Sequence, residues 1–93
     1  MPNLKSSMKD MRVSERRRLR NRPIISATRT YVRRANSAIT AGDATVAASA
    51  VGDAISALDK AASKGVIHRN NAARRKSRLM QRLNALVARA EQG

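Results

Sequence analysis

The sequence contains no cysteine, phenylalanine or tryptophan, and Tyr31 is its single aromatic residue. Without cysteine the chain can form neither a disulfide framework nor a thiolate zinc site. It also lacks the run of about 18 apolar residues that a transmembrane helix needs. The N-terminal stretch MPNLKSSMKDM has no apolar core of a secretory signal. We therefore expect neither a membrane span nor a cleaved presequence.

Large apolar side chains are also scarce, because alanine supplies much of the apolar composition of the 93 residues. Alanine favours helix but buries little surface, so each helix gains only modest hydrophobic stabilisation. We expect one small domain over residues 1–93, with a limited core and weak stability as an isolated chain.

Acidic residues are few, with 6 against 20 lysines and arginines, and the formal net charge is +14. Residues 1–34 carry 11 basic and 2 acidic groups, residues 35–63 carry 1 and 3, and residues 64–93 carry 8 and 1. Two basic ends thus flank a nearly neutral middle. Such a charge attracts polyanions, nucleic acid first and anionic membranes second.

Groups suited to catalysis are almost lacking. His68 is the only histidine, and no acidic residue lies between Asp59 and Glu91 to orient it. One histidine without cysteine supplies too few ligands for a metal site, and the isolated glycines form no phosphate-binding loop. We therefore expect no enzymatic activity, no cofactor, no metal and no small-molecule substrate.

Two glycine-containing breaks, TAGDAT at 40–45 and SKGVIH at 63–68, divide the chain into three helical segments. Gly42 and Gly65 suit the left-handed conformation that ends a helix, and Asp43 can cap the next one. Helices are expected at about 7–41, 44–63 and 68–90. Because the connections are short, the sequence predicts an all-α fold, a small antiparallel three-helix bundle with a long basic N-terminal helix.

Apolar residues recur at three- and four-residue steps in the second and third segments, as in amphipathic helices. In the middle helix this stripe comprises Ala47, Val51, Ala54, Ile55, Leu58, Ala61 and Ala62. In the last helix it comprises Ala72, Leu79, Leu83, Leu86, Val87 and Ala90. The opposite side of the last helix carries, within an arc of roughly 100°, Arg74, Arg75, Arg78, Arg82 and Arg89. Lys76 falls among the apolar positions, where its stem can follow the core edge while its ammonium reaches out.

The first segment changes character near Ile25. From there an apolar stripe continues through Val32, Ala35, Ala38 and Ile39. Before it, basic residues surround nearly the whole circumference, and the only candidates for a core are Leu4, Met8, Met11 and Leu19. A helix that is charged all round either extends away from the bundle or frays until a partner neutralises it.

Pro23 leaves two interpretations of this segment open. In one, a first helix ends near Asn21 or Arg22 and Pro23 lies in the first turn of a second helix. In the other, a single long helix is kinked at Pro23, at a cost of about 3 kcal/mol. The helical pattern resumes directly after the proline, which favours the kinked helix.

The basic C-terminal segment indicates a binding surface for an anion. Residues 64–90 contain eight basic groups and no acid, whereas a merely solvated face mixes signs. The planar guanidinium matches phosphate oxygens, and the scarcity of aromatic residues disfavours stacking on unpaired bases and anchoring in membranes. The pattern favours the phosphate and ribose surface of folded RNA. His68 either forms a local hydrogen bond at the helix start or contacts a phosphate or sugar there.

The stretch KGVIHRNNAARRKSRL at 64–79 resembles the signature of the bacterial small-subunit ribosomal protein family numbered twenty. SERRRLRN, ATRTYVRR and the AGD of the first turn extend the resemblance over most of the chain. It implies a three-helix bundle embedded in 16S ribosomal RNA, which binds this RNA directly and supports assembly of the 30S subunit. It further implies a ribosomal, cytoplasmic location, bacterial or organellar, with few protein contacts and no membrane partner.

The resemblance also implies a set of rRNA-binding residues. Positions that match the family motifs are Arg16, Arg17, Arg18, Asn21, Arg29, Thr30, Arg33, Arg34, Lys64, His68, Arg69, Asn70, Arg74, Lys76 and Ser77. Neighbouring residues that we add are Lys5, Lys9, Arg12, Arg20, Arg22, Asn71, Arg75, Arg78 and Arg82. Two alternatives remain: a DNA-compacting protein of the nucleoid type, and a scaffold that binds an acidic protein.

Overall fold

The computed structural model describes the backbone of residues 3–92 and the side chains of residues 11–91. Its helices, in chain order, are α1 (Asn3–Ala41), α2 (Ala44–Ser63) and α3 (Arg69–Gln92). The described residues contain no strand, which confirms the predicted all-α fold. The helix α2 covers the expected range, whereas α1 begins four residues before the expected start.

The first turn is formed as the sequence indicates. Gly42 has a φ of +87°, in the left-handed region that glycine adopts without steric cost. Its N–H donates to the carbonyl of Ile39 at 3.1 Å, which closes the end of α1. The Asp43 carboxylate accepts hydrogen bonds from the N–H groups of Thr45 and Val46 at 3.1 and 3.2 Å. It therefore caps α2 as predicted.

At the second turn, α2 ends in a Schellman motif, with two backbone hydrogen bonds that close the helix. Gly65 has a φ of +76°, and its N–H donates to the carbonyl of Ala62 at 3.0 Å. The N–H of Val66 donates to the carbonyl of Ala61 at 2.9 Å. These two bonds satisfy carbonyls that the end of α2 would otherwise leave without partners. Only a few residues then separate α2 from α3, so α3 returns along α2.

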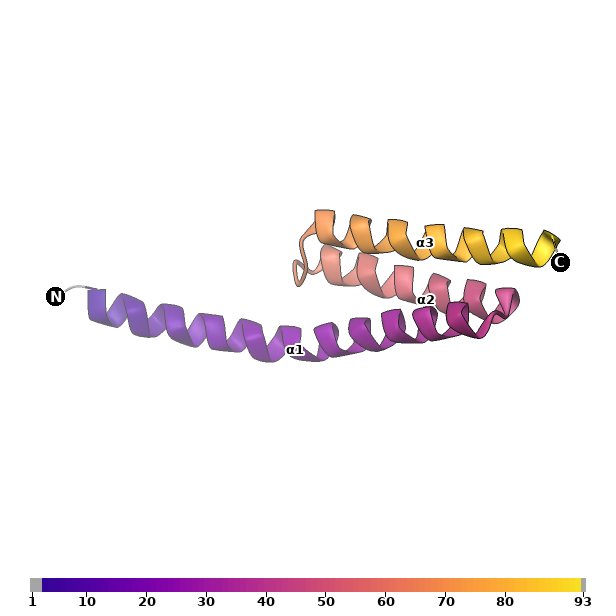
Figure 1. Cartoon of the computed structure of the whole chain (residues 1–93). Helices are drawn as coiled ribbons and strands as arrows, with labels where there is room; N and C mark the ends of the chain where they lie inside the picture. The colour runs from indigo at the N-terminus through magenta and orange to yellow at the C-terminus, as the bar shows by residue number, and fades with distance from the viewer. Residues whose placement is uncertain (1–2, 93) are drawn as a thin grey trace.

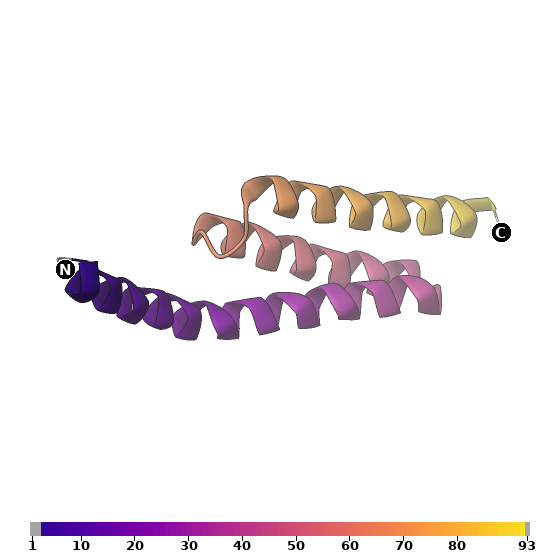
Figure 2. The same ribbon diagram turned by 60° about the vertical axis from the view of Figure 1, so that its left-hand side comes forward.

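Pro23 lies inside α1, which is one continuous helix. The ribbon of α1 is bent near its middle, where Pro23 stands (Figures 1 and 2). Proline has no N–H to donate, and its ring displaces the carbonyl of the residue four positions earlier, so the helix turns there. The interpretation as a single kinked helix is therefore correct, and no separate helix begins at this point.

The helix α2 lies between the other two, antiparallel to both α3 and the second half of α1 (Figure 1). The core cluster joins all three helices through Ala35, Ile39, Ala47, Val51, Ala54, Leu58, Ala72, Leu79, Leu83 and Leu86. Four of these ten residues are alanines, so part of the helix packing uses small side chains that bury little area per contact. Most of the predicted apolar stripes of α2 and α3 thus lie in the core.

The N-terminal half of α1 extends beyond the bundle (Figures 1 and 2). Met11 and Leu19 were candidates for a core, but they are 70% and 60% exposed. That prediction was wrong because no other helix reaches this part of α1. The side chains of Leu4 and Met8 lie outside the described residues. At the other end of the chain, Ala90 is exposed and does not join the core.

The extended half of α1 makes the molecule long and narrow. Its principal dimensions are 71 × 20 × 16 Å, and its radius of gyration is 18.3 Å. A compact chain of this length has a radius of gyration of about 12 Å. The protein therefore presents its charge along a rod rather than around a sphere.

Candidate nucleic-acid interface

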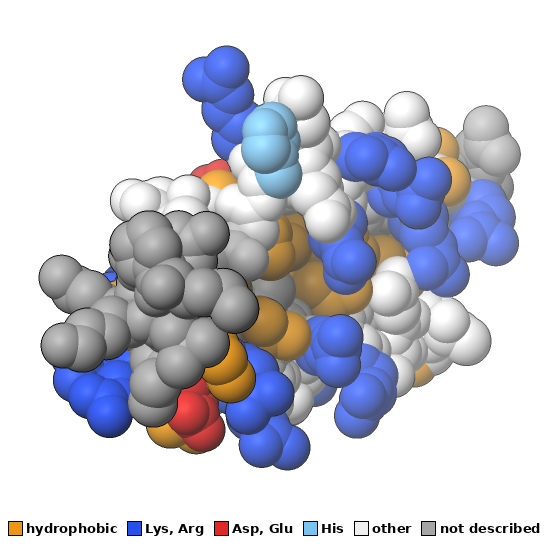
Figure 3. Space-filling view, turned by 90° about the vertical axis from the view of Figure 1, so that its left-hand side faces the viewer, with side chains coloured by type: hydrophobic (Ala, Val, Ile, Leu, Met, Phe, Trp, Pro, Cys, Tyr) orange, Lys and Arg blue, Asp and Glu red, His pale blue; other side chains and the backbone are white. Residues whose placement is uncertain are grey.

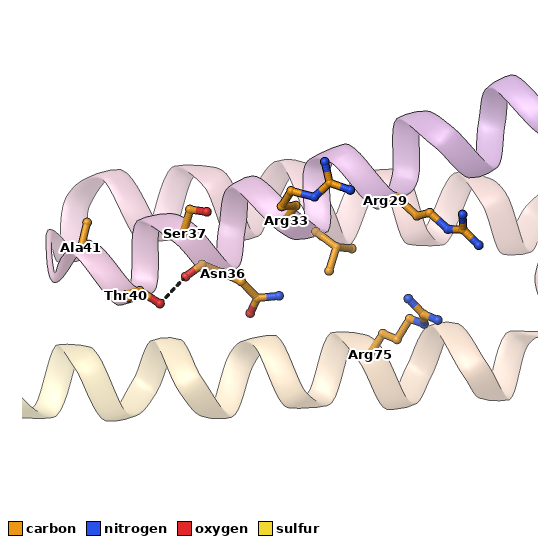
Figure 4. Close-up of a pocket in the computed structure, with 8 residues that line it drawn as sticks. Arg29, Arg33, Asn36, Ser37, Thr40, Ala41 and Arg75 are labelled. Carbon is orange, nitrogen blue, oxygen red and sulfur yellow. Dashed lines mark hydrogen bonds between the residues drawn. The ribbon is translucent and has the colours of Figure 1, made fainter.

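A basic groove runs between α1 and α3. It exists because both helices pack against α2, which leaves their neighbouring faces apart (Figure 4). We call it the α1–α3 groove and define it by Arg29, Val32, Arg33, Asn36, Asn71, Arg74, Arg75, Arg78, Leu79 and Arg82. Val32 and the buried Leu79 supply its apolar part. The space-filling view shows lysine and arginine side chains on both sides of an apolar strip (Figure 3).

Six arginines line this groove, two from α1 and four from α3. All six are exposed, so their guanidinium groups are accessible to a large ligand. None of the residues described as lining the groove is acidic. The groove therefore concentrates positive charge on a surface with no negative side chain to neutralise it.

Two asparagines orient arginines in the α1–α3 groove. Arg75 donates from Nε to Oδ1 of Asn71, one helical turn earlier, at 2.9 Å. Arg82 donates from its guanidinium to Oδ1 of Asn36, across the groove from α3 to α1. Because each bond uses part of the guanidinium, further N–H donors remain for phosphate oxygens. Two of the six groove arginines are thus held by hydrogen bonds and keep donors available for an anion.

Asn36 is a residue that the sequence analysis missed. It lies three residues after Arg33 on α1 and accepts from Arg82, 46 positions away. A signal was present, because Arg29, Arg33 and Asn36 follow three- and four-residue spacing on one helix face. The link to α3, however, depends on how the two helices are rotated about their axes.

The second basic surface is the arm, by which we mean residues 11–22 of α1. Every arginine predicted here is exposed: Arg12, Arg16, Arg17, Arg18, Arg20 and Arg22. The side chains of Lys5 and Lys9 lie outside the described residues. Arg18, Asn21 and Arg22 line a shallow hollow that continues toward Arg29, and Oδ1 of Asn21 is buried there without a hydrogen-bond partner in the structure.

His68 directly precedes α3 and is exposed (Figure 3). Its ring nitrogen Nδ1 accepts a hydrogen bond from the N–H of Asn70 at 3.1 Å, and its carbonyl accepts from Ala72 at 3.1 Å. The ring therefore acts as the N-cap of α3. This is the local hydrogen bond at the helix start that one of the two sequence interpretations predicts. Arg69 and Asn70 are exposed in the same turn.

Several predicted residues do not line the α1–α3 groove. Lys76 is half-buried and pairs with Asp59 of α2 at 2.6 Å. Lys64 lies in a separate hollow between α1 and α2. The guanidinium of Arg34 lies over the Tyr31 ring, 5.8 Å from its centroid. Of the remaining two, Thr30 donates to the carbonyl of Ser26 and Ser77 is exposed.

The described residues contain no cluster of three or more histidine, aspartate or glutamate side chains able to hold a metal ion. None of the three helices, as far as the structure describes them, combines the length and the hydropathy of a membrane span.

Comparison with known proteins gives consistent matches along the chain. A family model described as ribosomal protein S20 matches residues 2–84. The chain is 61% identical over 94 residues to small ribosomal subunit protein bS20 of Thermomicrobium roseum, with 100% of this chain and 95% of the relative covered. It is 51% identical over 88 residues to the bS20 protein of Cutibacterium acnes, covering 95% and 100%. For Desulforamulus reducens the identity is 45% over 87 residues, covering 94% and 99%.

Proposed function

Because the chain belongs to the ribosomal protein S20 family, we propose that it binds 16S ribosomal RNA directly as a structural component of the small subunit. The family consists of ribosomal structural proteins and is not an enzyme family. The relatives named above are proteins of the small ribosomal subunit. This chain has the same place in the small subunit and contacts the RNA directly.

The observation that carries the RNA contact is the α1–α3 groove, with six exposed arginines and no acidic residue described along it. Arginine forks match the spacing of phosphate oxygens, and neutralised phosphates release counterions. With one exposed aromatic ring in the whole chain, stacking on unpaired bases contributes little. Binding therefore relies on the backbone and on the shape of the RNA.

The arm gives this binding a second attachment point. Its arginines point outward around α1, at the end of a molecule that is 71 Å long. A rod of this length with basic surfaces at separate places contacts RNA segments that are distant from each other. By holding such RNA segments together, the protein supports assembly of the 30S subunit.

Replacing two groove arginines tests the proposal. We expect Arg74→Ala combined with Arg78→Ala to weaken binding to a 16S rRNA fragment. The slope of log affinity against log salt should fall in magnitude by about 1.4–1.8, since each phosphate contact contributes roughly 0.7–0.9. Filter binding at several salt concentrations measures this. The control is Arg89→Ala, an exposed arginine of α3 outside the groove. An unchanged slope in the double variant removes these residues from the interface.

A further inference from the structure

Two arginines of the α1–α3 groove face each other from opposite helices. The side chains of Arg29 on α1 and Arg75 on α3 point toward each other across the groove (Figure 4). Arg33 lies one turn along α1 from Arg29 and lines the same groove. Like charges held opposite each other repel, and at low salt this repulsion acts between the two helices.

Nothing on the described surface of the groove balances this repulsion. Among the side chains of residues 11–91, the only ion pair is that of Lys76 with Asp59, which joins α3 to α2 and is not part of the groove lining. The two asparagines hold Arg75 and Arg82 in place, but an amide brings no negative charge. The asparagines thus orient two of the groove arginines without neutralising them.

Direct packing between α1 and α3 is also limited. The core cluster is built around α2, with Ala47, Val51, Ala54 and Leu58 between the outer helices. Since the outer helices meet chiefly through the middle one, the groove side of the bundle has little apolar contact with which to offset charge repulsion.

We propose that the α1–α3 groove is the binding site of one RNA backbone strand. The phosphates of this strand supply the missing counter-charge and draw α1 and α3 together. The inference rests on the proposed function and deepens it, because it makes the RNA part of the bundle's own stability. Phosphate is favoured over carboxylate because oriented guanidinium forks with free Nη donors suit a row of phosphate oxygens. The groove arginines therefore destabilise the free protein and stabilise the bound one.

Neutralising the facing pair tests this inference. The groove variant is Arg29→Gln with Arg75→Gln. The control is Lys60→Gln with Arg89→Gln, which removes the same charge from exposed positions outside the groove. Thermal unfolding is followed by circular dichroism at low salt, with tripolyphosphate or with chloride at equal ionic strength.

In chloride, the groove variant should melt about 4 °C or more above both the wild type and the control, the size of a modest stability gain in a domain of this length. Tripolyphosphate should raise the midpoint of the wild type and the control, and leave that of the groove variant almost unchanged. A groove variant that melts at or below the control in chloride, or that keeps the full response to tripolyphosphate, overturns the inference.

Two further experiments distinguish failure of this inference from failure of the proposed function. If the wild type and the groove variant bind the 16S fragment equally well, the groove is not the binding site of the RNA strand, while the proposed function stands. If tripolyphosphate stabilises the wild type through these arginines but the 16S fragment does not bind, the proposed function fails, while the groove remains an anion-binding site. If polyglutamate stabilises the wild type as much as a short RNA of the same charge, the groove is a binding site for an acidic protein. That result would overturn the inference that it binds an RNA strand.

Discussion

His68 holds the start of α3 through a ring nitrogen, where most helices use an oxygen of serine, threonine, aspartate or asparagine. Because Nδ1 accepts the N–H of Asn70, the neutral ring carries its proton on Nε2. The side chain is exposed, so Nε2–H can still donate to a phosphate or sugar in the bound state. Capping and RNA contact are thus compatible roles of one ring.

The capping role can be isolated by substitution. His68→Ala should lower the free energy of unfolding by about 1 kcal/mol, the usual cost of losing an N-cap acceptor. His68→Asn should restore most of it, because asparagine is among the best N-cap residues. Urea unfolding followed by circular dichroism measures both. Equal losses in the two variants would show that the bond at Nδ1 is not what the residue contributes.

Residue patterns predicted the local features of this fold and failed where distant parts meet. Gly42 and Asp43 specify the first turn through backbone preference and capping, which need no knowledge of the rest. The pairing of Lys76 with Asp59 and that of Arg82 with Asn36 require the register of two helices. Register is set by packing of the whole bundle, which a single sequence does not reveal.

At the scale of elements, α1 is two functional parts in one helix. Its second half contributes Ala35 and Ile39 to the core, whereas the arm contributes no residue to it, and most of its side chains are exposed. The exposed Met11 and Leu19 follow from this division, and periodicity alone could not exclude them from a core. A helical stretch of about a dozen residues without tertiary contacts is marginally stable in water.

The arm should therefore fray in the free protein and become ordered on RNA. We expect amides of residues 12–22 to exchange hydrogen at least about tenfold faster than those of residues 47–58, because local opening there breaks no core contact. Addition of a 16S fragment should slow the exchange of the arm. Hydrogen exchange monitored by NMR measures both, with the core of α2 as internal reference. Strong protection of the arm without RNA would contradict the expectation.

At the scale of the whole molecule, charge explains attraction to any polyanion, and shape must explain the choice among them. A net charge of +14 attracts duplex DNA and RNA alike. The bend in α1, the arm and the α1–α3 groove fix the relative positions of two basic surfaces along 71 Å. A folded RNA can present phosphates on separate segments to both surfaces, whereas a straight duplex follows only one direction.

Competition between nucleic acids tests this argument. At near-physiological salt, a 16S fragment should displace labelled 16S RNA at a phosphate concentration at least about tenfold below that of duplex DNA, since non-specific contacts are strongly weakened by salt. Pro23→Ala is the matched variant: it leaves the charge unchanged and straightens α1, because the missing backbone hydrogen bond can form. It should narrow the preference for RNA by weakening RNA binding while DNA binding stays the same. Equal competition by DNA and RNA in the wild type would instead support a DNA-compacting role, with charge rather than shape selecting the partner.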